Sequence, residues 1–143
     1  MSGQVTLSPE ARDGLRRRAG RGYPQEDCGL LLGRREAGRV EVRRALRVRN
    51  RAGTGERTRR YRIDPADYLR CERRAQAAGL DVVGIWHSHP DGEAAPSRTD
   101  ARLAWARWCY LVAAVDRRGV RELRAWTLRG AGFREITLAP CPR

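Results

Sequence analysis

The 143-residue chain contains no lysine, because all 30 of its basic residues are arginine. This absence excludes Schiff-base chemistry and a lysine general base. Long hydrophobic runs are also missing. The longest, residues 108–115, has eight residues, whereas a membrane-spanning helix needs about 20. The first residues do not combine a basic start with a hydrophobic block, as a secretory signal does. We therefore expect a cytoplasmic protein that does not span a membrane.

The four cysteines, Cys28, Cys71, Cys109 and Cys141, form no C-x-x-C pair. This spacing excludes a zinc ribbon and a thioredoxin-type redox motif, and we expect four reduced thiols. The remaining composition, with 41% hydrophobic and 33% charged residues, is typical of a folded domain. We find no internal repeat and no linker, so residues 1–143 are expected to form a single domain.

The formal net charge of +13 is distributed unevenly. Residues 1–60 contain 16 arginines and seven acidic residues, while residues 81–104 contain two arginines and four acidic residues. A basic surface attracts nucleic acid or an acidic protein. The use of arginine alone also fits a bias towards GC-rich codons. Whether the basic surface is functional or reflects coding bias therefore stays open at this point.

Hydrophobic periodicity and capping residues predict an α/β (α+β) fold with one central sheet. Ser8 and Asp64 each precede a proline, as at a helix start, and predict helices over 9–19 and 65–78. A third, short helix is expected over 97–105, and a loop over 50–59. The predicted strands are 4–7, 28–33, 40–48, 60–63, 80–86, 108–115, 120–128 and 133–138.

The only two histidines, His87 and His89, lie two residues apart at the end of a predicted strand. Both side chains should therefore project from one face of that strand and suit a single metal ion. Asp100, in the short helix that follows, could supply a carboxylate. Two imidazoles and one carboxylate leave a fourth tetrahedral position for water, as in catalytic rather than structural zinc sites.

Each part of this pattern has a simpler interpretation. An H-x-H pair at a strand end can consist of hydrogen-bonded surface histidines. Ser97 and Asp100 have the spacing of a capping box at a helix start. The combination favours a metal site, because the two elements occur together with a spacer of six residues.

The combined pattern resembles the signature of the JAMM (MPN+) metalloproteases, also called the Mov34/MPN/PAD-1 family. The chain reads His87-Ser88-His89-Pro90, six residues, then Ser97-x-x-Asp100, and upstream it reads E-x-C-G-x-L-x-G from Glu26. The resemblance spans about residues 5–115 and is to the small prokaryotic members. It implies a single MPN domain of the cytidine-deaminase-like kind, with a curved mixed β-sheet and flanking helices.

The resemblance also implies roles for individual residues. His87, His89 and Asp100 would bind one Zn(II) per chain, with a water molecule in the fourth position. Glu26 would be the general base, and Ser97 would donate a hydrogen bond to the developing oxyanion. Asp27 is a less suitable base, because the strand-like run after it should place the neighbouring carboxylates on opposite faces.

Other residues near the motif are expected to have structural roles. Trp86 and Trp105 should pack in the core or at its rim, and Ser88 should form a structural hydrogen bond. Cys28 is a possible nucleophile in principle, but both histidines are better explained as metal ligands.

The implied activity is hydrolysis of the peptide or isopeptide bond after the C-terminal Gly-Gly of a ubiquitin-like sulfur-carrier protein. An acidic carrier would suit the arginine-rich surface. Two alternatives remain: a RadC-like nucleic-acid-associated protein and a non-catalytic MPN scaffold. RadC-like proteins typically read H-N-H-P-S-G, whereas residues 87–92 read H-S-H-P-D-G, so nucleic-acid binding is not expected. The identity of the partner and the oligomeric state, with a dimer possible, stay open.

Overall fold

The computed structural model describes residues 3–50, 63–96, 108–130 and 132–140. This part of the chain contains two helices and seven strands. They are β1 (Gln4–Leu7), α1 (Pro9–Gly22), β2 (Cys28–Glu36), β3 (Arg39–Val48), α2 (Pro65–Ala77), β4 (Asp81–Pro90), β5 (Cys109–Asp116), β6 (Gly119–Arg129) and β7 (Gly132–Pro140).

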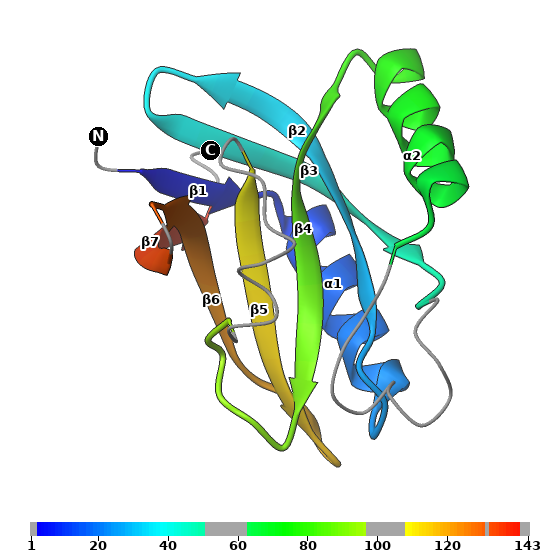
Figure 1. Ribbon diagram of the computed structural model, residues 1–143, viewed down its shortest axis with the longest axis vertical. Helices are drawn as coiled ribbons and strands as arrows, with labels where there is room; N and C mark the ends of the chain where they lie inside the picture. The colour runs from blue at the N-terminus through cyan, green and yellow to red at the C-terminus, as the bar shows by residue number, and fades with distance from the viewer. Residues whose placement is uncertain (1–2, 51–62, 97–107, 131, 141–143) are drawn as a thin grey trace.

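The described strands form one mixed sheet in the order β1-β3-β2-β4-β5-β6-β7, which closes into a barrel (Figure 1). β1 pairs in parallel with β3 and β7, β4 pairs in parallel with β5, and the other pairs are antiparallel. The predicted mixed fold with a curved sheet and flanking helices is therefore confirmed. Neither helix of the described chain is long and apolar enough to cross a membrane.

Both helices begin at the predicted capping residues. The Ser8 side chain accepts a hydrogen bond from the backbone N–H of Ala11, and Asp64 accepts one from that of Ala66. Three elements are longer than predicted: β4 continues through Pro90 instead of ending at Trp86, β2 through Glu36 instead of Gly33, and α1 through Gly22 instead of Ala19. The third predicted helix and all but the last residue of the predicted strand 60–63 lie outside the described residues.

The two helices pack against opposite faces of the sheet, because alternate strand residues belong to two separate hydrophobic clusters. Leu31 packs with Leu15 of α1, while Leu30 and Leu32 pack with Ala75 of α2. A strand covered on both faces reads as a continuous apolar run, which explains the sequence CGLLLG. Figure 1 shows α2 beside β2 and β4, and α1 behind the sheet.

A β-bulge interrupts the pairing of β2 with β4. Leu31 lies opposite Gly84, but Leu32 lies opposite Val82, so β4 contains one extra residue, Val83. Beyond the bulge the regular register resumes and places Cys28 opposite His87.

Because Gly29 of β2 has no side chain, the indole of Trp86 on β4 passes close to its backbone and reaches β3. A Cβ atom at Gly29 would lie 1.7 Å from the carbonyl oxygen of Leu46 and 2.2 Å from Nε1 of Trp86. That Nε1 donates a buried hydrogen bond to the Leu46 carbonyl at 2.9 Å. A side chain at position 29 would therefore collide with both partners of this bond.

We expect Gly29→Ala to lower the free energy of unfolding by at least about 2 kcal/mol, since the added methyl group forces the backbone of β3 and the indole to move. Gly132→Ala in β7 is the matched control, because no atom lies within 4 Å of its added methyl group. This control should change stability by no more than about 0.5 kcal/mol. Urea unfolding followed by circular dichroism measures both values, and equal midpoints for the two variants would contradict the prediction.

Candidate metal and catalytic site

Glu26, His87 and His89 meet where the start of β2 lies beside the end of β4. Cys28 is opposite His87, and the backbone N–H of Ser88 donates to the carbonyl of Asp27 at 2.9 Å. The antiparallel pairing thus continues one residue beyond the strand and leads Glu26 towards His89. One ligand atom from each of Glu26, His87 and His89 lies within 4.8 Å of the other two.

The two histidine rings converge through their Nε2 atoms, which lie 3.0 Å apart. Because β4 remains a strand through both residues, side chains two positions apart share one face. Nδ1 of His89 lies 2.9 Å from the carbonyl oxygen of Glu93. A carbonyl can only accept, so in the neutral ring Nδ1 carries the proton and Nε2 keeps its lone pair for a metal.

The donor set fits a zinc ion. Zinc binds imidazole nitrogen and carboxylate oxygen at about 2.0–2.2 Å in tetrahedral sites, so two nitrogens on one ion lie about 3.3 Å apart. The observed separation of 3.0 Å is close to that value. The described residues leave two roles open for Glu26, a metal ligand or a base beside the metal. Ser97 and Asp100 lie outside the described residues.

The neighbouring carboxylates of Glu26 and Asp27 have different surroundings, although both are buried. Asp27 accepts hydrogen bonds at 3.0 Å from the backbone N–H of Cys28 and from Nε of Arg47. Its charge is thus compensated by a residue of β3 rather than directed towards the histidines. This arrangement agrees with the prediction that the two carboxylates face different sides.

Three more predictions concern residues around the cluster. Ser88 forms a structural hydrogen bond as expected, since its Oγ accepts from the backbone N–H of Asp27 at 2.8 Å. Trp86 is fully buried in the core, and Trp105 lies outside the described residues. Cys28 is fully buried, and this burial, followed by the nearby carboxylate of Asp27, strongly raises the pKa of its thiol. A thiol held in its protonated form is a poor nucleophile, so this alternative loses its support.

The expectation of reduced thiols holds for the described cysteines, because Cys28, Cys71 and Cys109 are all free and buried. Burial also raises the pKa of Cys71, and it raises that of Cys109 to about 12. Cys141 lies outside the described residues.

The sequence did not identify Asn50 as part of the site. Its buried side-chain amide donates to the backbone carbonyl of Glu26 at 2.8 Å, across 24 positions in the chain. The sequence predicts Asn50 only as the first residue of a loop, on the basis of Gly53, Thr54 and Gly55. No local signal distinguishes an asparagine that holds a distant peptide from one that begins a turn.

Tyr23 and Asp91 form a second unpredicted link. The Tyr23 hydroxyl donates to the Asp91 carboxylate at 2.8 Å, and this hydrogen bond raises the pKa of Tyr23. The link joins the segment before Glu26 to the segment after His89.

The segment that follows β4 is fastened at further points. The backbone N–H of Asp91 donates to the Val115 carbonyl at 2.7 Å, Arg121 donates to the carbonyl of Gly92, and the indole of Trp126 donates to that of Ala94 at 3.0 Å. These bonds fix the backbone around Glu93. They thereby hold in place the carbonyl oxygen that sets the orientation of His89.

The chain is similar to a known protein family and to several named proteins. The sequence profile of the family described as prokaryotic homologues of the JAB domain matches residues 8–129. The chain is 34% identical to a desampylase of Haloferax volcanii, over 96% of this chain and 97% of that protein. It is 37% identical to the CysO-cysteine peptidase of Mycobacterium tuberculosis, over 60% of this chain and 56% of that protein.

A probable TtuB-protein conjugate cleaving protease of Thermus thermophilus is 35% identical, over 80% of this chain and 69% of that protein. Among solved structures, a protein of Desulfitobacterium hafniense superimposes with a TM-score of 0.84 at 25% identity, covering 97% of this chain and 94% of that one. The names desampylase, CysO-cysteine peptidase and conjugate cleaving protease support a hydrolase. The family profile covers most of the sequence and includes Glu26, both histidines and the S-x-x-D motif, so the chain belongs to the prokaryotic JAB-domain family.

Proposed function

We propose that the chain is a single-domain, zinc-dependent metallopeptidase of the cytoplasm. It hydrolyses the peptide or isopeptide bond after the C-terminal Gly-Gly of a ubiquitin-like sulfur-carrier protein. The convergence of Glu26, His87 and His89 carries this proposal. The substrate class is supported by similarity to proteins named desampylase, CysO-cysteine peptidase and TtuB-protein conjugate cleaving protease.

In this proposal His87, His89 and Asp100 hold one zinc ion per chain. When bound, zinc supplies a Lewis acid for the scissile carbonyl and lowers the pKa of water. Glu26 takes the proton from the attacking water and delivers it to the departing amine. Ser97 donates a hydrogen bond to the oxygen on which negative charge develops. No covalent link to the protein is needed.

The surroundings of Glu26 suit a general base. A base must stay within hydrogen-bond reach of the proton that it removes, and a buried side chain on an anchored peptide has few alternative positions. The amide of Asn50 holds the carbonyl of Glu26, and Ser88 pairs with the next residue, Asp27, through both its backbone and its side chain. Glu26 is only 4% exposed.

Zinc binding separates the two possible roles of Glu26. We expect the wild type to bind one zinc ion, and His89→Ala and Asp100→Ala to bind it at least about 100-fold more weakly, since each loses a ligand. Glu26→Gln should retain zinc affinity to within a few-fold, because a base is not a ligand. Competition with a chromogenic chelator measures these affinities. A loss in Glu26→Gln as large as that in His89→Ala would show that Glu26 is a ligand.

Cleavage tests the activity itself. The substrate is a ubiquitin-like sulfur carrier extended beyond its Gly-Gly, and mass spectrometry detects the released extension. Zinc-loaded wild type should release it, whereas a chelated sample should not, and Glu26→Ala should be slower by about 10²-fold or more. Glu93→Gln is the control, because it changes an exposed carboxylate near the site and keeps the backbone carbonyl that contacts His89. No release from several carriers, despite one bound zinc ion, would contradict the proposed substrate.

The proposed partner is acidic, and the charge of this protein suggests where it docks. A hollow of about 590 Å³ between β3 and α2 is lined by five arginines and one aspartate. The arginines are Arg47, Arg49, Arg70, Arg73 and Arg74. Arg47 and Arg70 form ion pairs with Asp27 and Asp67, so the excess positive charge comes from the other three. It adjoins Val48, which lies opposite Cys28, and Cys28 in turn lies opposite His87. An acidic carrier docked in this hollow would have its C-terminal tail near the histidines, because only β2 lies between β3 and β4 in the sheet.

For an acidic carrier, we expect KM to rise roughly tenfold between low and high salt, because ions screen the attraction between exposed charges. Arg73→Glu should raise KM at low salt with little change in kcat, while Arg134→Glu on β7 should not. A short neutral peptide with the same scissile bond provides a salt-insensitive control. A KM for the carrier that does not respond to salt would contradict electrostatic docking.

A further inference from the structure

The orientation of Glu26 depends on contacts outside the regular sheet, because this residue precedes β2, which begins at Cys28. The next residue, Asp27, provides a fixed point, since its backbone carbonyl still pairs with the N–H of Ser88. Successive side chains of a paired, extended segment point to opposite faces. A contact that holds the carboxylate of Asp27 on one side therefore directs the carboxylate of Glu26 to the other side, where the histidines lie.

The side chain of Asp27 is held by contacts from three parts of the chain. Its carboxylate accepts hydrogen bonds at 3.0 Å from the backbone N–H of Cys28 and from Nε of Arg47. The end of α1 packs tightly against it, because a Cβ atom at Gly22 would lie 2.8 Å from Cβ of Asp27. Arg47 lies on β3 opposite Gly29, so its side chain reaches back along β2 to make this contact.

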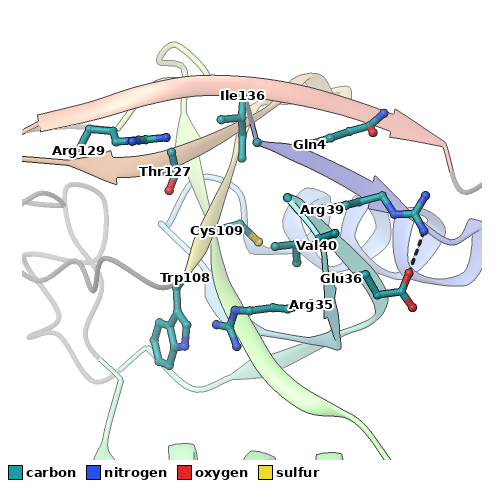
Figure 2. A pocket seen from close by; sticks show the side chains of 13 residues that line it. Gln4, Arg35, Glu36, Arg39, Val40, Trp108, Cys109, Thr127, Arg129 and Ile136 are labelled. Carbon is teal, nitrogen blue, oxygen red and sulfur yellow. Dashed lines mark hydrogen bonds and ion pairs between the residues drawn. The ribbon is translucent and has the colours of Figure 1, made fainter. Parts of the chain in front are cut away.

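The burial of Asp27 distinguishes its ion pair from one at the other end of β3. There Arg39 and Glu36 are also 3.0 Å apart, on the edge of the hollow that Figure 2 shows. The side chain of Glu36 is 55% exposed, so water readily replaces its arginine. That of Asp27 is only 6% exposed, and a buried carboxylate without its partner is strongly unfavourable. Loss of Arg47 should therefore turn Asp27 towards solvent and rotate the segment that carries Glu26.

We propose that Arg47 is a positioning residue for the hydrolysis: through Asp27 it keeps the carboxylate of Glu26 directed towards the histidines. This inference rests on the proposed function, in which Glu26 is the general base. A displacement of about 1 Å at a reacting group can cost about 10²-fold in rate. Arg47 also lines the hollow proposed for docking of the carrier, so positioning has to be separated from docking.

Steady-state kinetics on two substrates makes this separation. The substrates are the acidic carrier with its extension and a short neutral peptide with the same scissile bond. We expect Arg47→Gln and Asp27→Asn each to lower kcat at least tenfold on both substrates, with KM for the peptide within twofold of the wild-type value. An unchanged kcat on the peptide, or a change confined to KM for the carrier, would make Arg47 a docking residue and overturn the proposal.

Arg39→Gln is the matched control. It removes an arginine of the same strand from an ion pair of the same length, but the carboxylate left behind is exposed. Its kcat on the neutral peptide should stay within twofold of the wild-type value. A tenfold loss in this variant would show that any charge removed from β3 lowers activity, which contradicts a specific role for Arg47.

A double variant tests whether Arg47 acts through Asp27. In a background that already carries Asp27→Asn, Arg47→Gln should change kcat by no more than twofold, because both substitutions break the same link. The double variant leaves no buried carboxylate without its arginine, so it also remains informative where Arg47→Gln alone folds poorly. Losses that multiply in the double variant would mean that Arg47 acts by another route.

Amide hydrogen exchange followed by NMR tests the positioning without cleavage. The backbone N–H groups of Asp27 and Ser88 donate to Oγ of Ser88 and to the carbonyl of Asp27. In Arg47→Gln both amides should exchange at least tenfold faster, while that of Leu111, buried in β5, keeps its rate and shows that the protein is folded. Equal rates at Asp27 and Ser88 in the variant and the wild type would refute the inference. If the wild type cleaves neither substrate, the proposed function fails, whereas these rates still decide whether Arg47 holds the segment.

Discussion

The pairing of β2 with β4 is the constraint on which the site depends. Paired residues of these strands are 48 or more positions apart in the chain, yet the register alone decides which residue of β2 faces which histidine. In a sheet, a shift of one residue turns every side chain to the other face. The hydrogen bonds between Ser88 and Asp27 extend this register to the residue next to Glu26. The convergence of an acid with two imidazoles is thus a property of backbone pairing.

Around this pairing, the remaining contacts reduce the freedom of the residues that would perform chemistry. Asn50 holds the peptide of Glu26, while Tyr23 and Asp91 tie together the two segments that flank the site. Groups that are held before the substrate arrives need little rearrangement during the reaction, which is how proteins stabilise developing charge. The charge of Asp27 is compensated by Arg47, so it does not compete with Glu26 for the same position.

Much of this structure could be predicted from the sequence where the signal is local. Proline after a capping residue marked both described helix starts, and the H-x-H spacing on a strand placed both histidines on one face. The strand end at Trp86 was wrong because His87, Ser88 and His89 are polar, and buried polar residues look like a loop unless their partners are known.

Features that depend on contacts between distant segments could not be predicted either, because the sequence alone does not show which residues are partners. Closure of the barrel through β1 and β7 joins segments at the two ends of the described chain, and the hydrogen bond from Asn50 to Glu26 depends on how two strands are placed.

The bulge at Val83 determines how the length of β4 can change. Val82 and His87 are five residues apart, an odd number, yet both lie on the face covered by α2, because the extra residue reverses the alternation between them. Deleting Val83 would leave the two positions four apart, so a regular strand without the bulge would still place both on that face and keep His87 opposite Cys28. β4 is therefore one residue longer than its pairing with β2 requires, and the strand can lose that surplus residue without turning the imidazoles away from Glu26.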